Sequence, residues 1–384
     1  MYSRSLTMLI PSVFLVWGCS AVKFTAKSCE GDTNCLAAQG EPVSVRLDVK
    51  GGRVDVLIVN DNSASMSSEQ GQLAQRFNRF LAEFDQRFIE YRVATTTTDI
   101  SSAQNPARAI NQNGALQDGK LIAFSNGQSF LTPESGTAAE RTQMFNQAIR
   151  RSETLACEQF ISNWVASGKS RDSQEYAVAY QANCPSTDER GTYAANLVVQ
   201  SNPASFIRPE ADLAIIFLAD EDVRSQRYWN NEPGFALEEF DKASVLVSKV
   251  KEKYPQKTLG LHAIVVRDAN CLAQQSAQLN GVVSGSYGWE YHRGAQATNG
   301  VTGDICATDY TQQLIDIFNN IQGKIVDKIA FPCQAPQLEI INLTMNTNDP
   351  SITWSVVGSE IRFSKKLPVG TRVDYTYRCK PAGS

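Results

Sequence analysis

Apolar strand-like runs alternate with amphipathic helical patterns, and this alternation constrains the fold more than any other feature. Val54–Val59 is apolar except at Asp55, as expected of a strand covered on both faces. Three more runs are typical of strands: Tyr91–Ala94, Leu213–Ala219 and Leu259–Val266. Apolar residues spaced three or four apart predict helices at four places: Leu73, Phe77, Phe80, Leu81, Phe84 and Phe88; Met144, Phe145, Ala148 and Ile149; Phe240, Ala243, Val247 and Val250; and Leu314, Ile317, Phe318, Ile321 and Ile325.

This order predicts an α/β fold with a doubly wound, mostly parallel sheet and helices on both faces. We place this domain at residues 51–332. The pattern changes after Pro332 to short strand-like pieces separated by turns, which predicts a small all-β module at 333–384. A module of about fifty residues is near the size at which one core alone is marginal.

The first residues are typical of an export signal. Arg4 precedes a short apolar run, and Gly18 precedes Cys19. The segment Leu15–Cys19 resembles the bacterial lipobox, which implies a signal peptide at 1–18, acylation of Cys19 and a tether at 19–50. The alternative is a plain secretory signal with a coincidental cysteine. We therefore expect an exported protein that is lipid-anchored in the bacterial envelope. Ser20 is compatible with sorting to the outer membrane, on its periplasmic or surface face.

The cysteine count agrees with export. The chain has nine cysteines, and eight remain if Cys19 carries lipid. An even remainder in an exported chain predicts disulfides. Pairing of sequence neighbours is the simplest hypothesis, although connectivity does not follow from sequence alone: Cys29–Cys35, Cys157–Cys184, Cys271–Cys306 and Cys333–Cys379. The last bond would stabilise the β module by roughly 3 to 4 kcal/mol through loop closure.

Composition and histidine content argue against two function classes. The formal net charge is −4 and the pI is near 5.5, whereas nucleic-acid binding needs clustered Lys and Arg. We therefore expect no nucleic-acid partner. The two histidines, His262 and His292, form no nucleophile–base pair at a recognisable spacing, so we do not expect an enzyme.

The pattern that points to chemistry is Asp-x-Ser-x-Ser at Asp61, Ser63 and Ser65, between the first buried strand and the first helix. On its own the pattern is weak, because Asp and Ser also cap helix N-termini. Its context resembles the opening strand and loop of von Willebrand factor A domains. That family completes a metal-ion-dependent adhesion site with a threonine from a second loop and an aspartate from a third.

The resemblance covers roughly residues 51–330 and extends to both further loops. The segment from Glu189 to Thr192 resembles the threonine loop, and Leu213–Asp220 resembles the central strand with its aspartate. The resemblance implies five metal ligands: Asp61, Ser63, Ser65, Thr192 and Asp220. Two alternatives stay open, since Thr95–Thr98 could supply the hydroxyl and Asp222 the third-loop carboxylate.

Carboxylates and hydroxyls are hard oxygen donors, which suit Mg²⁺, Mn²⁺ or Ca²⁺. Mg²⁺ is our first choice because it keeps several waters and needs few protein ligands. The resemblance implies an open coordination position that binds a carboxylate on a protein or an acidic glycan. The leading hypothesis is therefore metal-dependent adhesion at the cell envelope. The alternative is a structural envelope scaffold with an inactive metal site.

Overall fold

The structure is a computed structural model. The part of the chain that it describes comprises residues 40–48, 52–87, 89–100, 118–186, 188–224, 237–255, 257–277, 285–325, 328–331, 333, 337–347, 349–365, 367 and 371–380. The predicted signal peptide, Cys19 and the Cys29–Cys35 pair lie outside the described residues.

A five-stranded parallel sheet forms the centre of the larger domain. Its strand order is β3-β2-β4-β5-β6, and every neighbouring pair runs parallel. The strands are β2 (Arg53–Asn60), β3 (Glu90–Thr97), β4 (Asp212–Ala219), β5 (Leu259–Val265) and β6 (Thr302–Asp304). Four of them match the predicted strands. The fifth, β6, has only three residues, which is too short to produce a readable apolar pattern.

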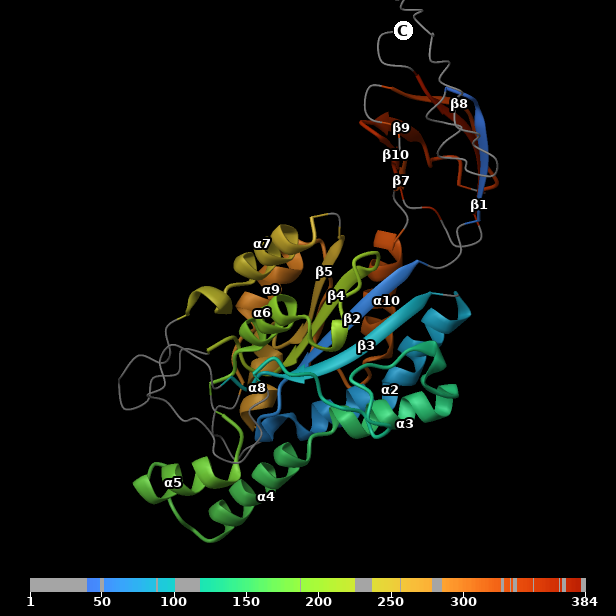
Figure 1. Ribbon diagram of the computed structural model, residues 1–384. Coiled ribbons are helices and arrows are strands. Elements are labelled where there is room, and N and C mark those ends of the chain that lie inside the picture. Colours follow the sequence, from blue (N-terminus) through green and yellow to red (C-terminus); the bar gives the residue numbers. More distant parts are fainter. Residues whose placement is uncertain are drawn as a thin grey trace, which may run out of the picture.

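Helices cover both faces of this sheet, which confirms the predicted doubly wound α/β arrangement (Figure 1). In β2, Val56 and Ile58 pack into one core, whereas Leu57 and Val59 pack into the other, as the two-residue period of a strand requires. The first core contains α2 (Ser67–Gln86), α3 (Ala138–Ile149) and α10 (Thr311–Ile325); the second contains α6 (Gly191–Ser201), α7 (Ala243–Lys253) and α9 (Trp289–Ala297). A further helix, α8 (Ala269–Ala277), follows β5.

Strand β3 continues to Thr97, three residues beyond its predicted end at Ala94. Thr95–Thr97 are fully buried within it. Threonine is β-branched and fits a pleated strand, as expected for the threonines into which the predicted strand runs.

The long helical region predicted after β3 contains a helical hairpin, formed by α4 (Ser152–Ala166) and α5 (Gln174–Asn183). The hairpin lies at the carboxyl end of the sheet (Figure 1). Cys157 and Cys184 link its two ends, and both pack with Ala64 of the loop that follows β2. The hairpin is therefore attached directly to the predicted metal loop.

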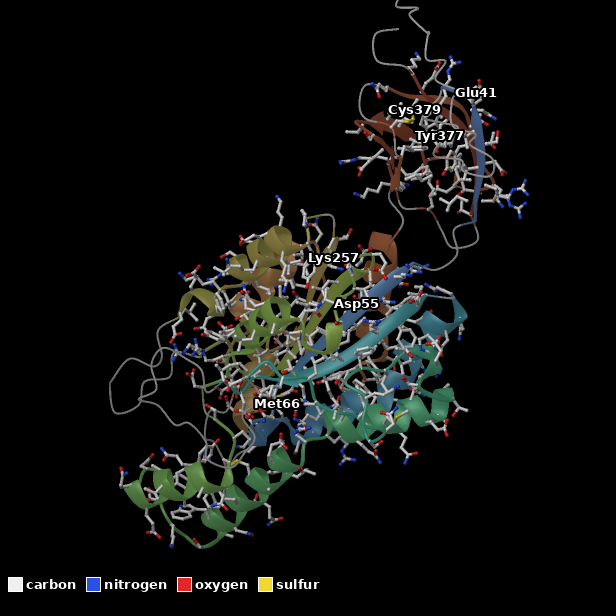
Figure 2. The ribbon with its side chains drawn as sticks, viewed as in Figure 1. Glu41, Asp55, Met66, Lys257, Tyr377 and Cys379 are labelled. Atoms are coloured by element: carbon white, nitrogen blue, oxygen red, sulfur yellow. A yellow bond between two sulfur atoms is a disulfide. The ribbon has the colours of Figure 1, made fainter. Side chains whose placement is uncertain are left out.

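The β module begins earlier in the chain than predicted. Val43–Asp48, assigned to the tether, forms β1 and pairs antiparallel with β11 (Arg372–Cys379). Figure 2 shows Glu41 in the same module as Tyr377 and Cys379. Val43 and Val373 share its core, while the six-residue pattern of β1 is too short to stand out in a polar segment. The predicted boundaries at 50 and 332 are therefore wrong in detail.

The module contains two three-stranded antiparallel sheets. In one, β11 pairs with β1 and with β8 (Leu338–Met345). In the other, β10 (Glu360–Phe363) pairs with β9 (Trp354–Val357) and with β7 (Lys328–Ala330). Because β7 lies before the predicted boundary, the module consists of residues 43–48 together with 328–379, and the α/β domain is inserted between these two segments.

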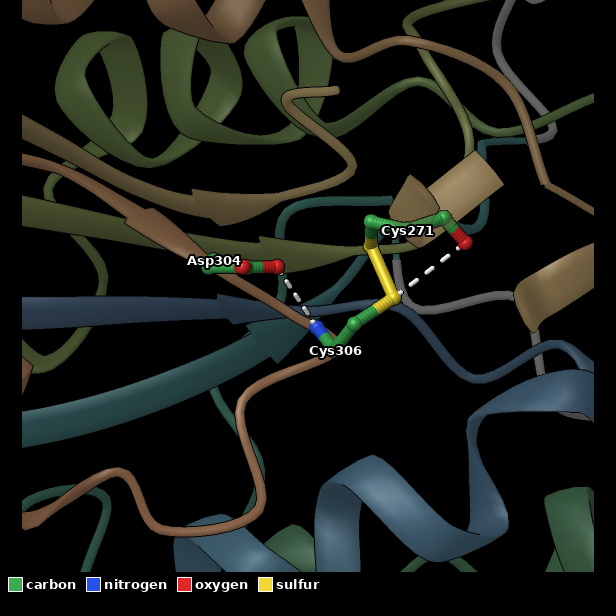
Figure 3. Close-up of side chains that lie close together, drawn as sticks. All are labelled: Cys271, Asp304 and Cys306. Carbon is green, nitrogen blue, oxygen red and sulfur yellow. Dashed lines mark hydrogen bonds between the residues drawn. A yellow bond between two sulfur atoms is a disulfide. The ribbon is translucent and has the colours of Figure 1, made fainter. Parts of the chain in front are cut away.

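Three disulfides confirm the predicted pairings of the described cysteines: Cys157–Cys184, Cys271–Cys306 and Cys333–Cys379. Asp304 lies beside the second of these and accepts a hydrogen bond from the Cys306 amide (Figure 3). This grouping resembles a metal site, but both sulfurs are joined to each other and offer no thiolate. Within the described ranges, no helix is both long and apolar enough to span a bilayer.

Candidate metal centre

Strand register brings Asp61 and Asp220 to the same place. Asn60, the last residue of β2, is paired with Leu218 of β4, and the Asp61 amide donates to the Leu218 carbonyl at 2.9 Å. Each aspartate directly follows its strand. The chain passes from β2 to β3 on one side and from β4 to β5 on the other, so these two strand ends flank the switch point of the sheet. Ligands bind at such points in α/β folds.

Three buried carboxylates meet here: Asp61, Glu189 and Asp220. One oxygen from each lies within 4.8 Å of the others. Asp61 and Asp220 are 0% exposed and Glu189 is 4% exposed. Both oxygens of Asp220, Oδ2 of Asp61 and Oε2 of Glu189 accept no hydrogen bond from the residues that the structure describes. Buried charges without partners are strongly unfavourable, so this cluster needs protons or a cation.

The pKa shifts of the three carboxylates also indicate that the cluster requires protons or a cation. Burial raises the pKa of Asp61, and contacts with Glu189 and Ser63 offset only part of the rise. Burial also raises the pKa of Asp220 and that of Glu189 well above their usual values, and repulsion from Asp61 is the next cause for both. A divalent cation would reverse these shifts, because an opposite charge at short range favours the ionised carboxylate.

Ser63 and Ser65 complete the oxygen set. Their hydroxyl oxygens are 3.0 Å apart, and both residues are half-buried, unlike the three carboxylates. The Ser65 hydroxyl lies close enough to lower the pKa of Asp220 without making a hydrogen bond of normal geometry. The serines therefore lie on the side where the cluster approaches the surface.

The simple alternative for this motif was a helix cap, and the structure does not support it. Ser63 precedes the 3₁₀ turn Ala64–Met66 but its side chain makes no capping hydrogen bond, and neither does that of Met66 before α2. Instead the Asp61 carboxylate accepts the Ser63 amide at 2.8 Å, an Asx turn that holds the loop. Figure 2 places Met66 at the end of the sheet near the α4–α5 hairpin.

Side chains from neighbouring elements hold the backbone of this first loop. Gln70 Nε2 donates to the Asp61 carbonyl at 2.8 Å, and the Thr154 hydroxyl donates to the Asn62 carbonyl at 2.8 Å. Asn62 Nδ2 donates to Asp99 at 2.8 Å, and burial raises the pKa of Asp99 to about 7. The loop is thus fixed from α2, α4 and the end of β3.

Thr192, predicted as the second-loop ligand, has its hydroxyl committed elsewhere. It donates to the backbone carbonyl of Asp241. The same loop instead places the carboxylate of Glu189, three residues earlier, beside Asp61 and Asp220. Helix α6 begins at Gly191, where a Cβ would lie 2.5 Å from the Tyr291 hydroxyl oxygen. Sequence reasoning missed Glu189, whose only signal was its place in a charged segment before a helix.

The residues that flank Glu189 belong to a separate ion-pair network. Arg190 is fully buried and makes a bidentate contact with Asp241, with both distances 2.9 Å. Arg224 binds both oxygens of Asp188 at 3.0 and 2.8 Å. Asp188 and Arg190 are therefore engaged on one side of the loop, whereas Glu189 between them contributes to the carboxylate cluster.

Of the alternative ligands, Asp222 and Thr96 make local hydrogen bonds, whereas the hydroxyls of Thr95 and Thr97 have no hydrogen-bond partner among the described residues. The Asp222 carboxylate accepts the Glu290 amide at 2.9 Å at the start of α9, and burial raises the pKa of Asp222 to about 6. Thr96 donates its hydroxyl to the Lys120 carbonyl at 2.8 Å. The carbonyl of Thr98 accepts the Arg190 amide at 3.1 Å, which links the end of β3 to the second loop.

Comparisons with known proteins give only remote similarities. No family model and no curated protein matches the chain. The open conformation of the pilus adhesin SpaC from Lactobacillus rhamnosus GG is 11% identical, with a TM-score of 0.33, over 89% of this chain and 41% of that one. Proximal thread matrix protein 1 from the mussel byssus is 9% identical, with a TM-score of 0.35, over 74% of this chain and 50% of that one.

A second structure of the mussel protein, described as having a zinc occupied MIDAS motif, is 11% identical with a TM-score of 0.31, over 73% of this chain and 48% of that one. The chain thus spans half or less of the length of each of these proteins. Scores of this size carry no argument about function, which must come from the site itself.

Proposed function

We propose that the chain binds one divalent cation between Asp61, Glu189 and Asp220, with Ser63 and Ser65 as further oxygen donors. The observation that carries this proposal is the set of buried carboxylate oxygens that accept no hydrogen bond from the described residues. The donor set fits Mg²⁺, Mn²⁺ or Ca²⁺, which prefer oxygen ligands. The site resembles the metal-ion-dependent adhesion site of von Willebrand factor A domains in its first and third loops.

The function that this chemistry supports is adhesion through the ion. A bound cation supplies positive charge at the edge of the sheet. The half-buried serines lie on its accessible side, where a carboxylate of a partner protein or an acidic glycan would approach. Catalysis fits less well. The His262 ring accepts the Val301 amide at 3.2 Å, and the His292 ring is 2.9 Å from the Thr302 hydroxyl, so both rings are engaged in local contacts.

The position of the site fits a protein anchored through Cys19. The carboxyl ends of the strands and the β module lie at opposite ends of the α/β domain (Figure 1). Strand β1 belongs to the module, so the chain from Cys19 enters the protein there. An anchor at Cys19 would then hold the module toward the membrane and present the metal site away from it.

Divalent-metal binding tests the proposal directly. Isothermal titration of Mg²⁺, Mn²⁺ and Ca²⁺ should give one site in the wild type and a loss of affinity of at least about 100-fold in Asp61→Ala, because that change removes a charged ligand. Glu175→Gln is the matched control, since Glu175 is an exposed acid on α5. Equal affinity in the wild type and Asp61→Ala would defeat the proposal.

A second candidate function is a structural ion that stabilises a scaffold. The near-complete burial of the three carboxylates favours it. Retention on an immobilised acidic glycan such as alginate, or on a Glu-rich peptide, separates the two. Adhesion predicts that a chelator or Asp61→Ala releases the protein, whereas a scaffold role predicts no ion-dependent retention.

A further inference from the structure

We infer that Glu189 is a built-in ligand that occupies the position of a partner's carboxylate, so that an external acidic group binds the ion only after displacing Glu189. This inference rests on the proposed ion. In the described conformation, the protein's own Glu189 would bind the ion. Glu189 would therefore compete with the carboxylate of an external partner.

Geometry places Glu189 among the ligands. Its carboxylate lies within 4.8 Å of the ligand oxygens of both aspartates, and Oε2 accepts no hydrogen bond from the described residues. It comes from the loop in which the resemblance implies a neutral threonine. The Thr192 hydroxyl in the same loop donates to the Asp241 carbonyl, whereas Glu189 is the residue of this loop whose carboxylate lies beside both aspartates.

The charge balance makes Glu189 and an external carboxylate alternatives. Two aspartates match the charge of a divalent ion, and the third carboxylate brings the site to a net charge of −1. A fourth carboxylate would bring it to −2 in a buried setting, where repulsion between like charges is strong. When the Glu189 carboxylate moves away from the ion, the charges of the ion and the two aspartates cancel again. The same movement frees a coordination position on the ion.

The backbone around Glu189 is fixed, so the exchange requires movement of its side chain rather than of the loop. Its carbonyl accepts the Arg224 amide at 2.8 Å, and the next amide, from Arg190, donates to Thr98. The α4–α5 hairpin borders the same space. Burial raises the pKa of Tyr180 on α5, and the charges of Tyr176 and Glu189 add to the rise.

Europium luminescence tests this inference, because the lifetimes in H₂O and D₂O count the waters on the bound ion. We expect Glu189→Gln to add about one water and to lower Ca²⁺ affinity about tenfold. We also expect acetate, as a carboxylate probe, to displace that water at a concentration at least about tenfold lower than in the wild type. Glu189→Asp keeps the charge but withdraws the oxygen, and should also gain water.

Glu221→Gln is the matched control. Glu221 raises the pKa of Asp220 through its charge but is not one of the three clustered carboxylates. It should therefore keep the hydration and the acetate response of the wild type. Equal hydration and acetate response in the wild type, Glu189→Gln and Glu189→Asp overturn this inference alone. Failure of the wild type to bind any ion overturns it together with the proposed function.

Discussion

Two buried acidic clusters share one loop, and their carboxylates are compensated in different ways. Asp188 and Asp241 are each bound by an arginine, in the network that also contains Glu238. Asp61 and Asp220 form no ion pair with any residue in the described part of the chain. Both clusters are equally removed from water. The difference supports a structural role for the first cluster and the proposed cation for the second, where no described residue supplies a compensating charge.

Loop 188–190 connects the two clusters. Asp188 and Arg190 anchor it in the cluster whose carboxylates bind arginines, which we call the paired cluster. This anchoring positions Glu189 beside Asp61 and Asp220, in the unpaired cluster. A rigid support next to an electrostatically unfavourable site is a common arrangement for function, because the support compensates for local instability. Four experiments test this difference between the two clusters.

Arg190→Leu should lower the free energy of unfolding by about 3–5 kcal/mol, because it removes the bidentate partner of buried Asp241 and leaves only the more distant Arg224, at 3.7 Å. Urea denaturation in the presence of a chelator measures this loss. Arg53→Leu breaks an ion pair that is half exposed on both sides, and should change stability little. Equal losses in the two variants would mean that the buried network has no special structural role.

Asp220→Asn should act in the opposite direction on the metal-free protein. Removing one of three repelling charges should raise its free energy of unfolding by about 1 kcal/mol, while affinity for the divalent ion falls at least about 100-fold, or about 2.7 kcal/mol. Asp188→Asn is the matched change in the cluster that contains Arg190 and Arg224, where Arg224 loses its bidentate carboxylate partner but keeps Glu238. It should destabilise the protein and leave ion affinity within a few-fold of the wild type.

The pH dependence of stability should test the cluster of Asp61, Glu189 and Asp220, although burial raises the pKa of Asp188 in the other cluster as well. Because burial raises the folded-state pKa of Asp61, Glu189 and Asp220, their contribution to stability is present below about pH 4 and is lost as pH rises through the folded values. Asp99, with a pKa of about 7, acts in the same direction. The metal-free protein should therefore lose about 1–2 kcal/mol of stability between pH 5 and 8.

Saturating Ca²⁺ or Mg²⁺ should remove the part of that decline that comes from Asp61, Glu189 and Asp220, since the ion stabilises the ionised carboxylates. Thermal unfolding across the pH range, with metal and with a chelator, measures both effects. A melting temperature of the chelated protein that rises steadily from pH 5 to 8 would show that the cluster does not control stability in this range.

Thr192→Val should give the smallest effect. Loss of its hydrogen bond to the Asp241 carbonyl should cost about 1 kcal/mol of stability, with ion affinity changed less than about twofold. Titration with Ca²⁺ and urea denaturation test the two parts. A fall of tenfold or more in affinity would restore Thr192 as a ligand, as the resemblance implies.

The sheet and two of its site residues were predictable because their signals are local. The apolar runs of β2 and β4 mark buried strands, and parallel strands bring Asp61 and Asp220 to one edge. The choice between Glu189 and Thr192 was not predictable. It depends on side-chain direction in a loop that is set by Arg190 binding Asp241, a residue 51 positions away.

The role of β1 was hidden for a related reason. Its six residues alternate correctly, but their partner strand lies at the other end of the chain. A short polar segment has no local feature that separates a tether from an edge strand whose partner is distant. The disulfide pairings were easier to predict, because cysteines that are consecutive in the sequence are also close in space.

The pairing of β1 with β11 has a consequence for biogenesis. Ser44 and Thr376 form a hydrogen bond at 2.9 Å although they are 332 positions apart in the sequence. During synthesis, β1 emerges long before its partner, and contacts so distant in sequence close slowly. The module can therefore be completed only after β11 has been synthesised, so its assembly would report that translation has passed the whole α/β domain.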